Sequence, residues 1–250
     1  MERRSFLRGL ALIAACPLCT GIGHAAEGAH WSYEGEAGPD KWGALEAEYG
    51  ACSAGSQQSP IDITGVVKAE LPDLGIAWKP GGEMVNNGHT IQVNAAPGGA
   101  LTRGDRRYDL VQYHFHAPSE HLLDGHHFPM EVHFVHKNAA TGGLGVLGVF
   151  LKAGASNADF AALAAAFPAK AKQTAPVAAV DPTGLLPASR GYWAYEGSLT
   201  TPPCSEIVDW MVAQEPIEVA QADIDKFTAI YSMNARPALA INRRFVLGSK

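Results

Sequence analysis

Two histidines, His114 and His116, stand two positions apart in the run Gln112-Tyr113-His114-Phe115-His116. Side chains alternate between the two faces of an extended strand, so both imidazoles and the Gln112 amide project to the same side. Imidazole nitrogens are common zinc ligands, and a neighbouring pair of them on one face is the beginning of a metal site. The same spacing also fits two packed or surface histidines, so a third ligand is needed.

A third histidine follows in the run MEVHFVH at residues 130–136. In an extended strand Glu131, His133 and Val135 share one face, whereas His136 lies on the other. If this strand lies beside the strand of the first pair, His133 completes a set of three imidazoles. Three nitrogen ligands leave one tetrahedral position of a zinc ion open, which is the arrangement of a catalytic zinc site.

The whole chain has 250 residues, which suits one generous domain or two small ones. Hydrophobic residues make up 47% of it, enough for a packed core. The net charge is -6 and the body of the chain has no basic run, which argues against nucleic acid as a partner because phosphate binding needs clustered Lys and Arg. Beyond the first residues, no apolar run is long enough to span a membrane.

Residues 1–26 have the pattern of a signal peptide, with a basic start (MERRSFLR), an apolar stretch from Gly9, and small residues at Ala25-Ala26. The run Arg-Arg-Ser-Phe-Leu resembles a twin-arginine signal, and an ordinary Sec signal is the alternative. A further alternative is lipoprotein processing at Cys16, which would leave the protein lipid-anchored. We therefore predict a mature domain of residues 27–250 that is periplasmic or secreted.

Four cysteines occur in the chain, and two of them, Cys16 and Cys19, leave with the signal peptide. Cys52 and Cys204 remain in the mature domain. In an exported protein two cysteines most simply form one disulfide, and two free buried thiols are the alternative. We predict the bond between Cys52 and Cys204.

The hydrophobic pattern predicts mostly strands over residues 60–151 and again over 192–213, where Thr201-Pro202-Pro203 interrupts the run. Helices are expected over residues 158–166 and 222–233. Residues 30–60 carry aromatic side chains without periodicity, which is typical of a segment wrapped over a core. The pattern as a whole predicts a single domain of mostly β (α+β) structure.

Six motifs in a fixed order resemble the alpha class of carbonic anhydrases, in its exported bacterial form. They are HWSY at 30–33, QQSPIDI at 57–63, NNGH at 86–89, QYHFH at 112–116 with SEH at 119–121, EVHFVH at 131–136, and GSLTTPP at 197–203. The resemblance extends from about His30 to Phe245. It implies a central, twisted, mostly antiparallel sheet with small peripheral helices, and an enzyme that reversibly hydrates carbon dioxide to bicarbonate and a proton.

The resemblance places one Zn²⁺ on His114, His116 and His133, in agreement with the argument from strand faces. It gives His121 a structural role near Glu131 and Tyr195. The other candidates are less suitable: His136 faces away from His133 in a regular strand, and the pair His126 and His127 falls in a turn.

A ligand histidine needs an acceptor for its second ring nitrogen. Gln112 shares the strand face of His114, and Glu131 shares that of His133, so the resemblance assigns these two residues the acceptor role. Ordinary strand polarity is the alternative explanation for both.

In this family zinc lowers the pKa of its bound water to about 7, and the zinc-bound hydroxide attacks carbon dioxide. Thr200 resembles the residue that accepts the hydrogen of this hydroxide, and Glu120 resembles the carboxylate that accepts the proton of Thr200. His89 matches the histidine proton shuttle, because an ordinary histidine pKa near 6.5 suits a relay at neutral pH. The alternatives are a turn residue for Thr200 and a surface turn residue for His89.

The substrate pocket implied by the resemblance has an apolar wall and a polar side. The residues matched to the pocket are Val135, Val146, Leu199, Thr201, Val208 and Trp210. The residues matched to the polar side, which would order water near His89, are Tyr33, Asn87 and Gln92. The apolar members are also ordinary core residues.

Two other functions share these features. One is a carbonic anhydrase-like binding module without activity, although such modules typically lack one or more of the zinc histidines. The other is a zinc hydrolase that cleaves esters with the same hydroxide. We expect a small-molecule substrate, carbon dioxide or bicarbonate, and a homodimer is possible.

Overall fold

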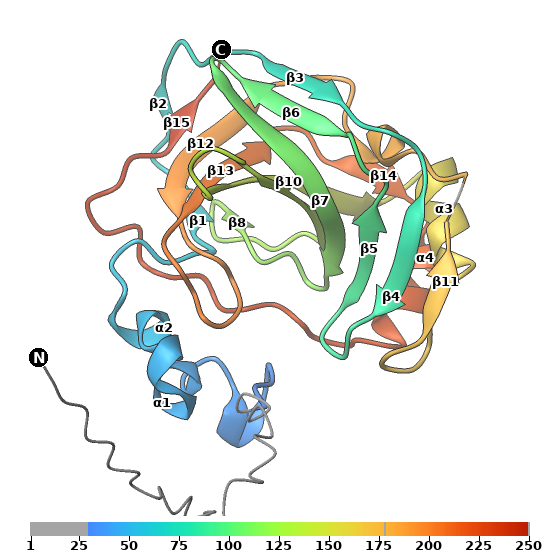
Figure 1. Cartoon of the computed structure of the whole chain (residues 1–250), viewed down its shortest axis with the longest axis horizontal. Coiled ribbons are helices and arrows are strands. Elements are labelled where there is room, and N and C mark those ends of the chain that lie inside the picture. Colours follow the sequence, from blue (N-terminus) through green and yellow to red (C-terminus); the bar gives the residue numbers. More distant parts are fainter. Residues whose placement is uncertain (1–29, 178, 250) are drawn as a thin grey trace, which may run out of the picture. The chain divides into compact units, whose positions relative to one another are not determined.

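Thirteen strands form one large twisted sheet in the unit that spans Trp31–Lys250 (Figure 1). The computed structural model describes residues 30–177 and 179–249, so the predictions made for residues 1–26, with Cys16 and Cys19, lie outside the described part. In chain order the strands of the sheet are β2 (Val67–Lys68), β3 (Leu74–Ala77), β4 (Gly82–Asn86), β5 (Ile91–Ala95), β6 (Ala100–Arg103), β7 (Arg106–His116), β9 (Met130–Lys137), β10 (Leu144–Ala153), β11 (Thr174–Pro176), β12 (Tyr192–Gly197), β13 (Val208–Ala213), β14 (Ile217–Val219) and β15 (Leu247–Gly248).

Most neighbouring strands of the sheet run antiparallel, as predicted. Their order is β11-β4-β5-β7-β9-β10-β13-β12-β15-β2, with β6 joining β3 to β7 and β14 pairing with β10. The sheet is nevertheless mixed, because β10 runs parallel to β13 and β14, and β15 runs parallel to β2. A separate parallel pair joins β1 (Asp62–Ile63) to β8 (Leu122–Leu123).

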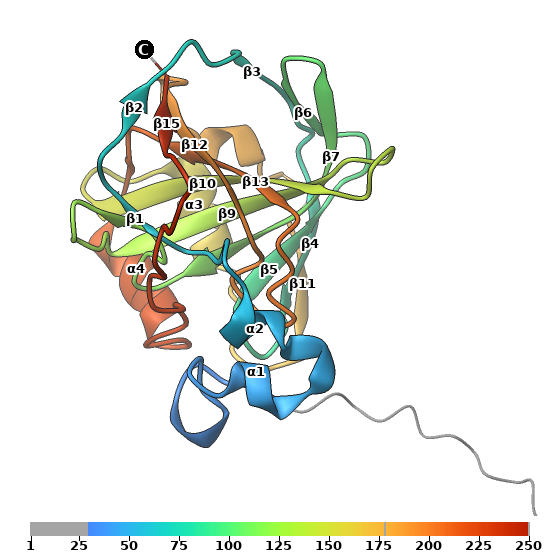
Figure 2. The ribbon, with the colours of Figure 1, turned by 90° about the vertical axis from the view of Figure 1, so that its left-hand side faces the viewer.

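The helices are short and lie around the sheet, in agreement with the sequence-based expectation. They are α1 (Trp42–Leu45), α2 (Ala51–Ala54), α3 (Ala158–Ala164) and α4 (Gln221–Thr228), with 3-10 turns η1 (Gly35–Ala37), η2 (Ala47–Tyr49) and η3 (Pro182–Leu185). Figure 2 shows α1 and α2 side by side, apart from α3 and α4. The α4 helix ends five residues before the predicted residue 233. Among the described residues, no helix has the length and apolar character needed to cross a membrane.

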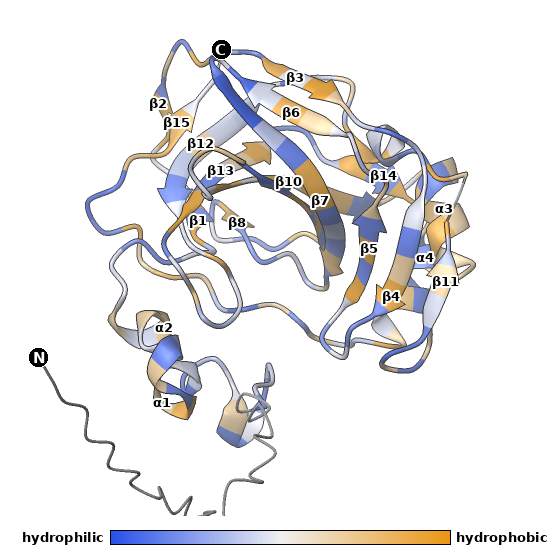
Figure 3. Cartoon of the chain, viewed as in Figure 1, coloured by the Kyte–Doolittle hydropathy of each residue, from blue (hydrophilic) through white to orange (hydrophobic). Residues whose placement is uncertain are grey.

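The two faces of the sheet are covered by different groups of apolar side chains. On β9, Val132 and Phe134 belong to the larger cluster, together with the buried aromatic residues of β7. A second cluster contains Val146 and Trp210, with the partly buried Val135 packed against it. Figure 3 shows β7 beginning with hydrophilic residues and carrying hydrophobic residues further along. Glu131 and His133 share the face of Val135 on β9, so they lie on the side of the second cluster. His114 of β7 lies opposite His133 in the ladder and is on the same side.

A bulge in β7 decides which face its histidines take. Leu110 pairs with His136 of β9 and Gln112 with Val135, so Val111 is the extra residue. Before the bulge Leu110 is buried in the larger cluster, and after it Tyr113 is. The extra residue shifts the alternation by one position, which turns the even-numbered residues after it to the opposite face. If β7 had no bulge and Leu110 stayed where it is, His114 and His116 would point into the larger cluster.

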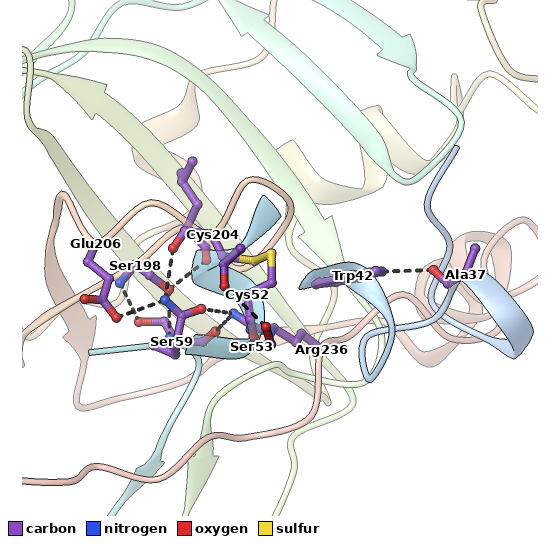
Figure 4. Close-up of a disulfide and its surroundings, with 12 residues drawn as sticks. Ala37, Trp42, Cys52, Ser53, Ser59, Ser198, Cys204, Glu206 and Arg236 are labelled. Carbon is purple, nitrogen blue, oxygen red and sulfur yellow. Dashed lines mark hydrogen bonds between the residues drawn. A yellow bond between two sulfur atoms is a disulfide. The ribbon is translucent and has the colours of Figure 1, made fainter. Parts of the chain in front are cut away.

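A disulfide ties the N-terminal segment to the loop between β12 and β13, as predicted (Figure 4). It joins Cys52 of α2 to Cys204, 152 residues away along the chain. Figure 4 also shows the buried Arg236 beside it. The Arg236 guanidinium donates to the Cys52 carbonyl at 3.0 Å and lies over the Trp42 ring, and Gln58 donates to the Cys204 carbonyl at 3.0 Å. The loop that carries Thr200 is thus anchored on the side of Cys204.

Candidate metal centre

Strands β7 and β9 bring three imidazoles together, because His114 and His133 lie directly opposite each other in the ladder. The ring centroids of His114 and His116 are 5.0 Å apart, those of His114 and His133 are 5.4 Å apart, and those of His116 and His133 are 4.6 Å apart. One nitrogen from each ring lies within 4.8 Å of the other two. The structure therefore assembles the set that strand alternation predicts.

Each of these rings has an acceptor beside one nitrogen. His114 Nδ1 lies 2.8 Å from Gln112 Oε1. His133 Nε2 lies 2.9 Å from Glu131 Oε1, a contact of ion-pair distance without the geometry of a hydrogen bond. His116 Nδ1 lies 2.7 Å from the carbonyl oxygen of Asn234. A partner at one ring nitrogen fixes the tautomer and leaves the other nitrogen with its lone pair.

The chemistry of this donor set fits a zinc ion. His116 Nε2 is buried and has no hydrogen-bond partner among the described residues, which is costly for a polar atom that binds nothing. Burial, with the charges of the neighbouring rings, holds the pKa of His114 well below its usual value, and burial also lowers the pKa of His116. A metal ligand must be a neutral imidazole, and these surroundings favour the neutral form.

The third ring has a different electrostatic environment. Burial lowers the pKa of His133, but the charge of Glu131 and its contact with the ring outweigh burial and raise the pKa overall. Burial likewise raises the pKa of Glu131, yet His121 and His133 together hold it well below its usual value. Glu131 is therefore a buried carboxylate that increases the basicity of the ring, as the acceptors of metal-bound histidines do.

Glu131 is saturated with donors. Its Oε2 accepts the backbone N–H groups of Glu120 and His121, each at 2.9 Å, and its Oε1 lies 2.8 Å from His121 Nδ1. Gly148 of β10 lies alongside, and a Cβ there would come within 2.7 Å of Glu131 Oε1. Only glycine leaves room for the carboxylate at this approach.

His121 has partners at both ring nitrogens, because its Nε2 lies 2.6 Å from the Tyr195 hydroxyl. Tyr195 in turn donates to Ser59 Oγ at 3.0 Å, and Ser59 Oγ also accepts the N–H of Ser198 at 3.1 Å. His121 can therefore be assigned to a chain of hydrogen bonds that connects Glu131 with the loop carrying Thr200.

The remaining histidine candidates lie outside the cluster. His136 is on the other face of β9, where its Nε2 accepts from Trp78 Nε1 at 3.0 Å and its Nδ1 lies 3.1 Å from the Gly145 carbonyl. Burial lowers the pKa of His136 to about 4, so the ring is neutral at pH 7. His126 and His127 each have Nδ1 near a backbone carbonyl, at 2.7 Å and 2.6 Å respectively.

Glu120 is fully buried beside the cluster. Its Oε1 accepts the backbone N–H of Arg236 at 2.8 Å. Its Oε2 lies 3.5 Å from His116 Nε2 and 3.8 Å from His133 Nδ1, and has no hydrogen-bond partner among the described residues. Thr200 is also buried, but no hydrogen bond joins it to Glu120, so the acceptor role expected of Glu120 toward Thr200 stays a prediction.

A cavity of about 130 Å³ opens onto this cluster and brings together most of the predicted polar residues. Its lining residues are Trp31, Tyr33, Asn87, His89, Thr90, Gln92, Gln112, His114, His116 and Thr201. His89 stacks on Trp31, with ring centroids 3.7 Å apart and an interplanar angle of 7°. Asn87 Nδ2 donates to Gln92 Oε1 at 3.3 Å.

The predicted apolar wall also forms one group. Val146, Val208 and Trp210 are buried in the second cluster, and Val135 and Leu199 pack against it. The Trp210 ring centroid lies 4.9 Å from that of His133. The cluster of three histidines therefore lies between an apolar wall and a polar cavity.

Two residues of the site gave no usable signal in the sequence. Asn234 holds His116 through its backbone carbonyl, an interaction to which every residue type has access. Arg236 holds Glu120 through its backbone N–H. Both lie in an irregular segment after α4, where neither strand nor helix periodicity applies.

Comparisons with known proteins agree on one family. The family model for eukaryotic-type carbonic anhydrase matches residues 37–247. A carbonic anhydrase of Pectobacterium carotovorum is 40% identical over 226 residues, covering 89% of this chain and 92% of the relative. That of Neisseria gonorrhoeae is 42% identical over 234 residues, covering 92% of each. The solved alpha-carbonic anhydrase of Thermovibrio ammonificans, in complex with the inhibitor sulfanilamide, superposes with a TM-score of 0.85 at 43% identity, covering 88% of this chain and 99% of that one.

Proposed function

The chain belongs to the eukaryotic-type, or alpha, carbonic anhydrase family, and from this premise we propose that it is a zinc-dependent enzyme that reversibly hydrates carbon dioxide to bicarbonate and a proton. The observation that carries the proposal is the cluster of His114, His116 and His133, each with an acceptor beside one ring nitrogen. His116 Nε2, buried without a partner among the described residues, supports the metal role of the cluster.

The residues that would hold zinc are His114 through Nε2, His116 through Nε2 and His133 through Nδ1, because the opposite nitrogen of each ring has an acceptor beside it. When bound, zinc supplies a Lewis acid that makes water a nucleophile near neutral pH. Gln112 and Glu131 keep the rings oriented, and the carboxylate of Glu131 raises the basicity of His133.

Carbon dioxide is apolar, so the wall formed by Val135, Val146, Leu199, Val208 and Trp210 provides its binding surface. Thr200 accepts a hydrogen bond from the hydroxide that attacks the substrate, and Glu120 fixes the Thr200 hydroxyl as an acceptor by accepting a hydrogen bond from its O–H. The attacking oxygen, with its hydrogen held by Thr200, then presents a lone pair to the carbon atom of carbon dioxide. Thr201 lines the polar cavity that opens onto His114 and His116.

The proton released in each turnover leaves through the polar cavity. His89 is the relay, because an imidazole takes up and releases a proton near neutral pH. Tyr33, Asn87 and Gln92 line the same cavity and order the water between the cluster and His89. The stacking of His89 on Trp31 gives the ring a defined place at the cavity wall.

Residues 1–26 are the proposed signal peptide, of twin-arginine type, and residues 27–250 the mature domain in the periplasm. The disulfide between Cys52 and Cys204 supports export, because such bonds persist in oxidising compartments. The lipid-anchored form through Cys16 would be detected as a shift of the mature protein to the membrane fraction.

Stopped-flow hydration of carbon dioxide tests the proposed ligands. In His116→Ala both zinc content and hydration should be lost. The matched control is His126→Ala, which replaces an exposed histidine and should leave both intact. Full zinc content and activity in His116→Ala would reject the ligand set. Hydrolysis of an ester without hydration of carbon dioxide would favour the zinc hydrolase, and a zinc-bound protein active in neither assay would favour the binding module.

The proposed relay is tested by His89→Ala. Turnover at saturating carbon dioxide is limited by proton transfer in this mechanism, so kcat should fall by about 100-fold, the usual contribution of a positioned proton-transfer group. The ratio kcat/KM reports the attack step and should change little. Added imidazole buffer should restore much of the kcat. Equal loss in both parameters without rescue would make His89 a structural residue.

A further inference from the structure

The side chain of Asn234 connects the zinc-ligand strand to the turn that carries His89. Asn234 is completely buried, and its Nδ2 donates to two carbonyl oxygens, that of Phe115 at 2.9 Å and that of His89 at 3.1 Å. Its Oδ1 accepts the N–H of Ala117 at 2.8 Å. Since one side of the carboxamide faces a donor and the other faces two acceptors, its orientation is fixed by its partners.

The backbone of the same residue is also fully engaged. The Asn234 N–H donates to the Ala117 carbonyl at 3.0 Å, and its own carbonyl lies 2.7 Å from His116 Nδ1. Every polar group of Asn234 is thus bound to β7 near its end or to the turn after β4. Phe115, which receives one of the Nδ2 bonds, stands between the two ligands His114 and His116.

The turn that carries His89 also has hydrogen bonds of its own. Asn87 Oδ1 accepts the backbone N–H groups of His89 and Thr90 at 2.9 Å and 3.0 Å, and Asn87 N–H donates to the Thr90 carbonyl at 3.1 Å. Thr90 Oγ1 donates to the Phe115 carbonyl at 2.5 Å. The Phe115 carbonyl is therefore shared by Thr90 and Asn234, which makes it the point where the turn meets β7.

We infer that the carboxamide of Asn234 is a positioning residue for proton transfer, which sets the place of His89 relative to the zinc ligands. The inference rests on the proposed function, in which His89 relays the proton. A proton crosses ordered water only when donor and acceptor keep a fixed separation, and a displacement of the order of 1 Å reduces such a step by up to about 100-fold. Asn234 links the two ends of that path by one rigid side chain.

Replacement of Asn234 by aspartate is the sharpest perturbation, because it changes one group and almost no volume. The carboxylate retains an acceptor for Ala117 but faces the carbonyl oxygens of Phe115 and His89 with a second oxygen. Two favourable contacts become repulsive, and we expect the turn to move away from β7. The matched control is Asn157→Asp, at the start of α3, where Nδ2 also donates to a carbonyl, that of Gly184 at 2.8 Å, far from the site in the chain.

The experiment compares the wild type with Asn234→Asp, His89→Ala, the double variant and Asn157→Asp in stopped-flow hydration, with zinc content measured for each. In Asn234→Asp we expect kcat to fall roughly tenfold, a smaller loss than the about 100-fold expected of His89→Ala. The ratio kcat/KM and the zinc content should not change. The double variant should have the kcat of His89→Ala alone, because Asn234 acts through His89. Imidazole buffer should restore kcat in both single variants.

A measurement independent of activity accompanies the kinetics. The backbone amide hydrogens of His89 and Thr90 should exchange faster with solvent in Asn234→Asp than in the wild type and in Asn157→Asp, because the turn has lost a link to β7. Unchanged exchange and unchanged kcat would overturn the inference. If Asn234→Asp does not fold, Asn234→Ser removes both Nδ2 donations without adding charge, and the same expectations apply to it.

Failure of the inference is distinguishable from failure of the proposed function. If His89→Ala lowers kcat and Asn234→Asp does not, only the inference is wrong. If Asn234→Asp loses zinc and reduces kcat and kcat/KM together, Asn234 acts on the metal site through His116 and the positioning role is wrong. If His89→Ala itself leaves kcat unchanged, the proposed relay is wrong and the inference falls with it.

Discussion

Replacement of Glu131 by glutamine tests how far the metal centre depends on one buried carboxylate. Both oxygens of Glu131 face donors: Oε2 accepts the N–H groups of Glu120 and His121, and Oε1 lies 2.8 Å from His121 Nδ1 and 2.9 Å from His133 Nε2. Glutamine has the same shape but only one acceptor oxygen. Whichever way its amide turns, an NH₂ group faces two N–H groups or two imidazole rings.

The size of the effect follows from these contacts. Loss of a partner that orients a metal ligand typically lowers metal affinity by about 10- to 100-fold, which is roughly 1.4–2.8 kcal/mol. We expect the upper end for Glu131→Gln, because the carboxylate is fully buried and no water can replace it. The free energy of unfolding should also fall by ~1–3 kcal/mol, because two buried donors lose their acceptor.

Zinc affinity measured by competition with a chromophoric chelator is the assay for Glu131→Gln, with urea unfolding of the metal-free protein alongside. The matched control is Glu218→Gln, which breaks the surface pair between Glu218 and Lys152 at 3.3 Å. Exposed pairs contribute little to stability and this one lies on β14, so zinc affinity should stay within about twofold. Unchanged zinc affinity in Glu131→Gln, or an equal loss in the control, would refute the reasoning.

Three further changes have defined outcomes. Gln112→Ala should weaken zinc binding by about tenfold through the loss of the acceptor of His114, again measured by chelator competition. Burial lowers the pKa of His136 to about 4, whereas in the unfolded chain it is about 6.5, so the unfolded chain binds the proton first as the pH falls. The free energy of unfolding should therefore drop by ~3 kcal/mol between pH 7 and pH 4. Urea titrations of His136→Gln should lack that part of the pH dependence. Replacing Cys52 and Cys204 by serine should lower the unfolding free energy by at most ~5 kcal/mol, the chain-entropy value for a 152-residue separation, and equal urea midpoints before and after the change would contradict this.

The clustering of His114, His116 and His133 could be predicted from the sequence because it depends on local alternation. His114 and His116 share a face in any extended strand, and His133 and His136 lie on opposite faces of β9, as the structure confirms. The bulge at Val111 could not be predicted in this way, since it follows from the pairing of β7 with β9. The prediction survived because both histidines lie on the same side of the bulge.

Contacts between distant backbone groups were outside the reach of the sequence. Asn234 is 118 positions from His116, and its carbonyl has no residue-specific signature. The parallel pairing of β10 with β13 was likewise not expected, because a hydrophobic run such as Val146-Leu147 indicates a buried strand but not the direction of its neighbour. The α4 helix was predicted too long because apolar residues continue the pattern beyond Thr228, where the backbone is no longer helical.

Metal dependence of carbon dioxide hydration tests the central proposal most directly. The mature protein, residues 27–250, is analysed for metal, treated with a zinc chelator, and then supplied with Zn²⁺, with hydration followed by stopped flow at each stage. We expect one zinc per chain, loss of hydration with loss of the metal, and recovery when Zn²⁺ is returned. Hydration that persists at full rate in metal-free protein, or a zinc-loaded protein that does not hydrate carbon dioxide, would contradict the proposal.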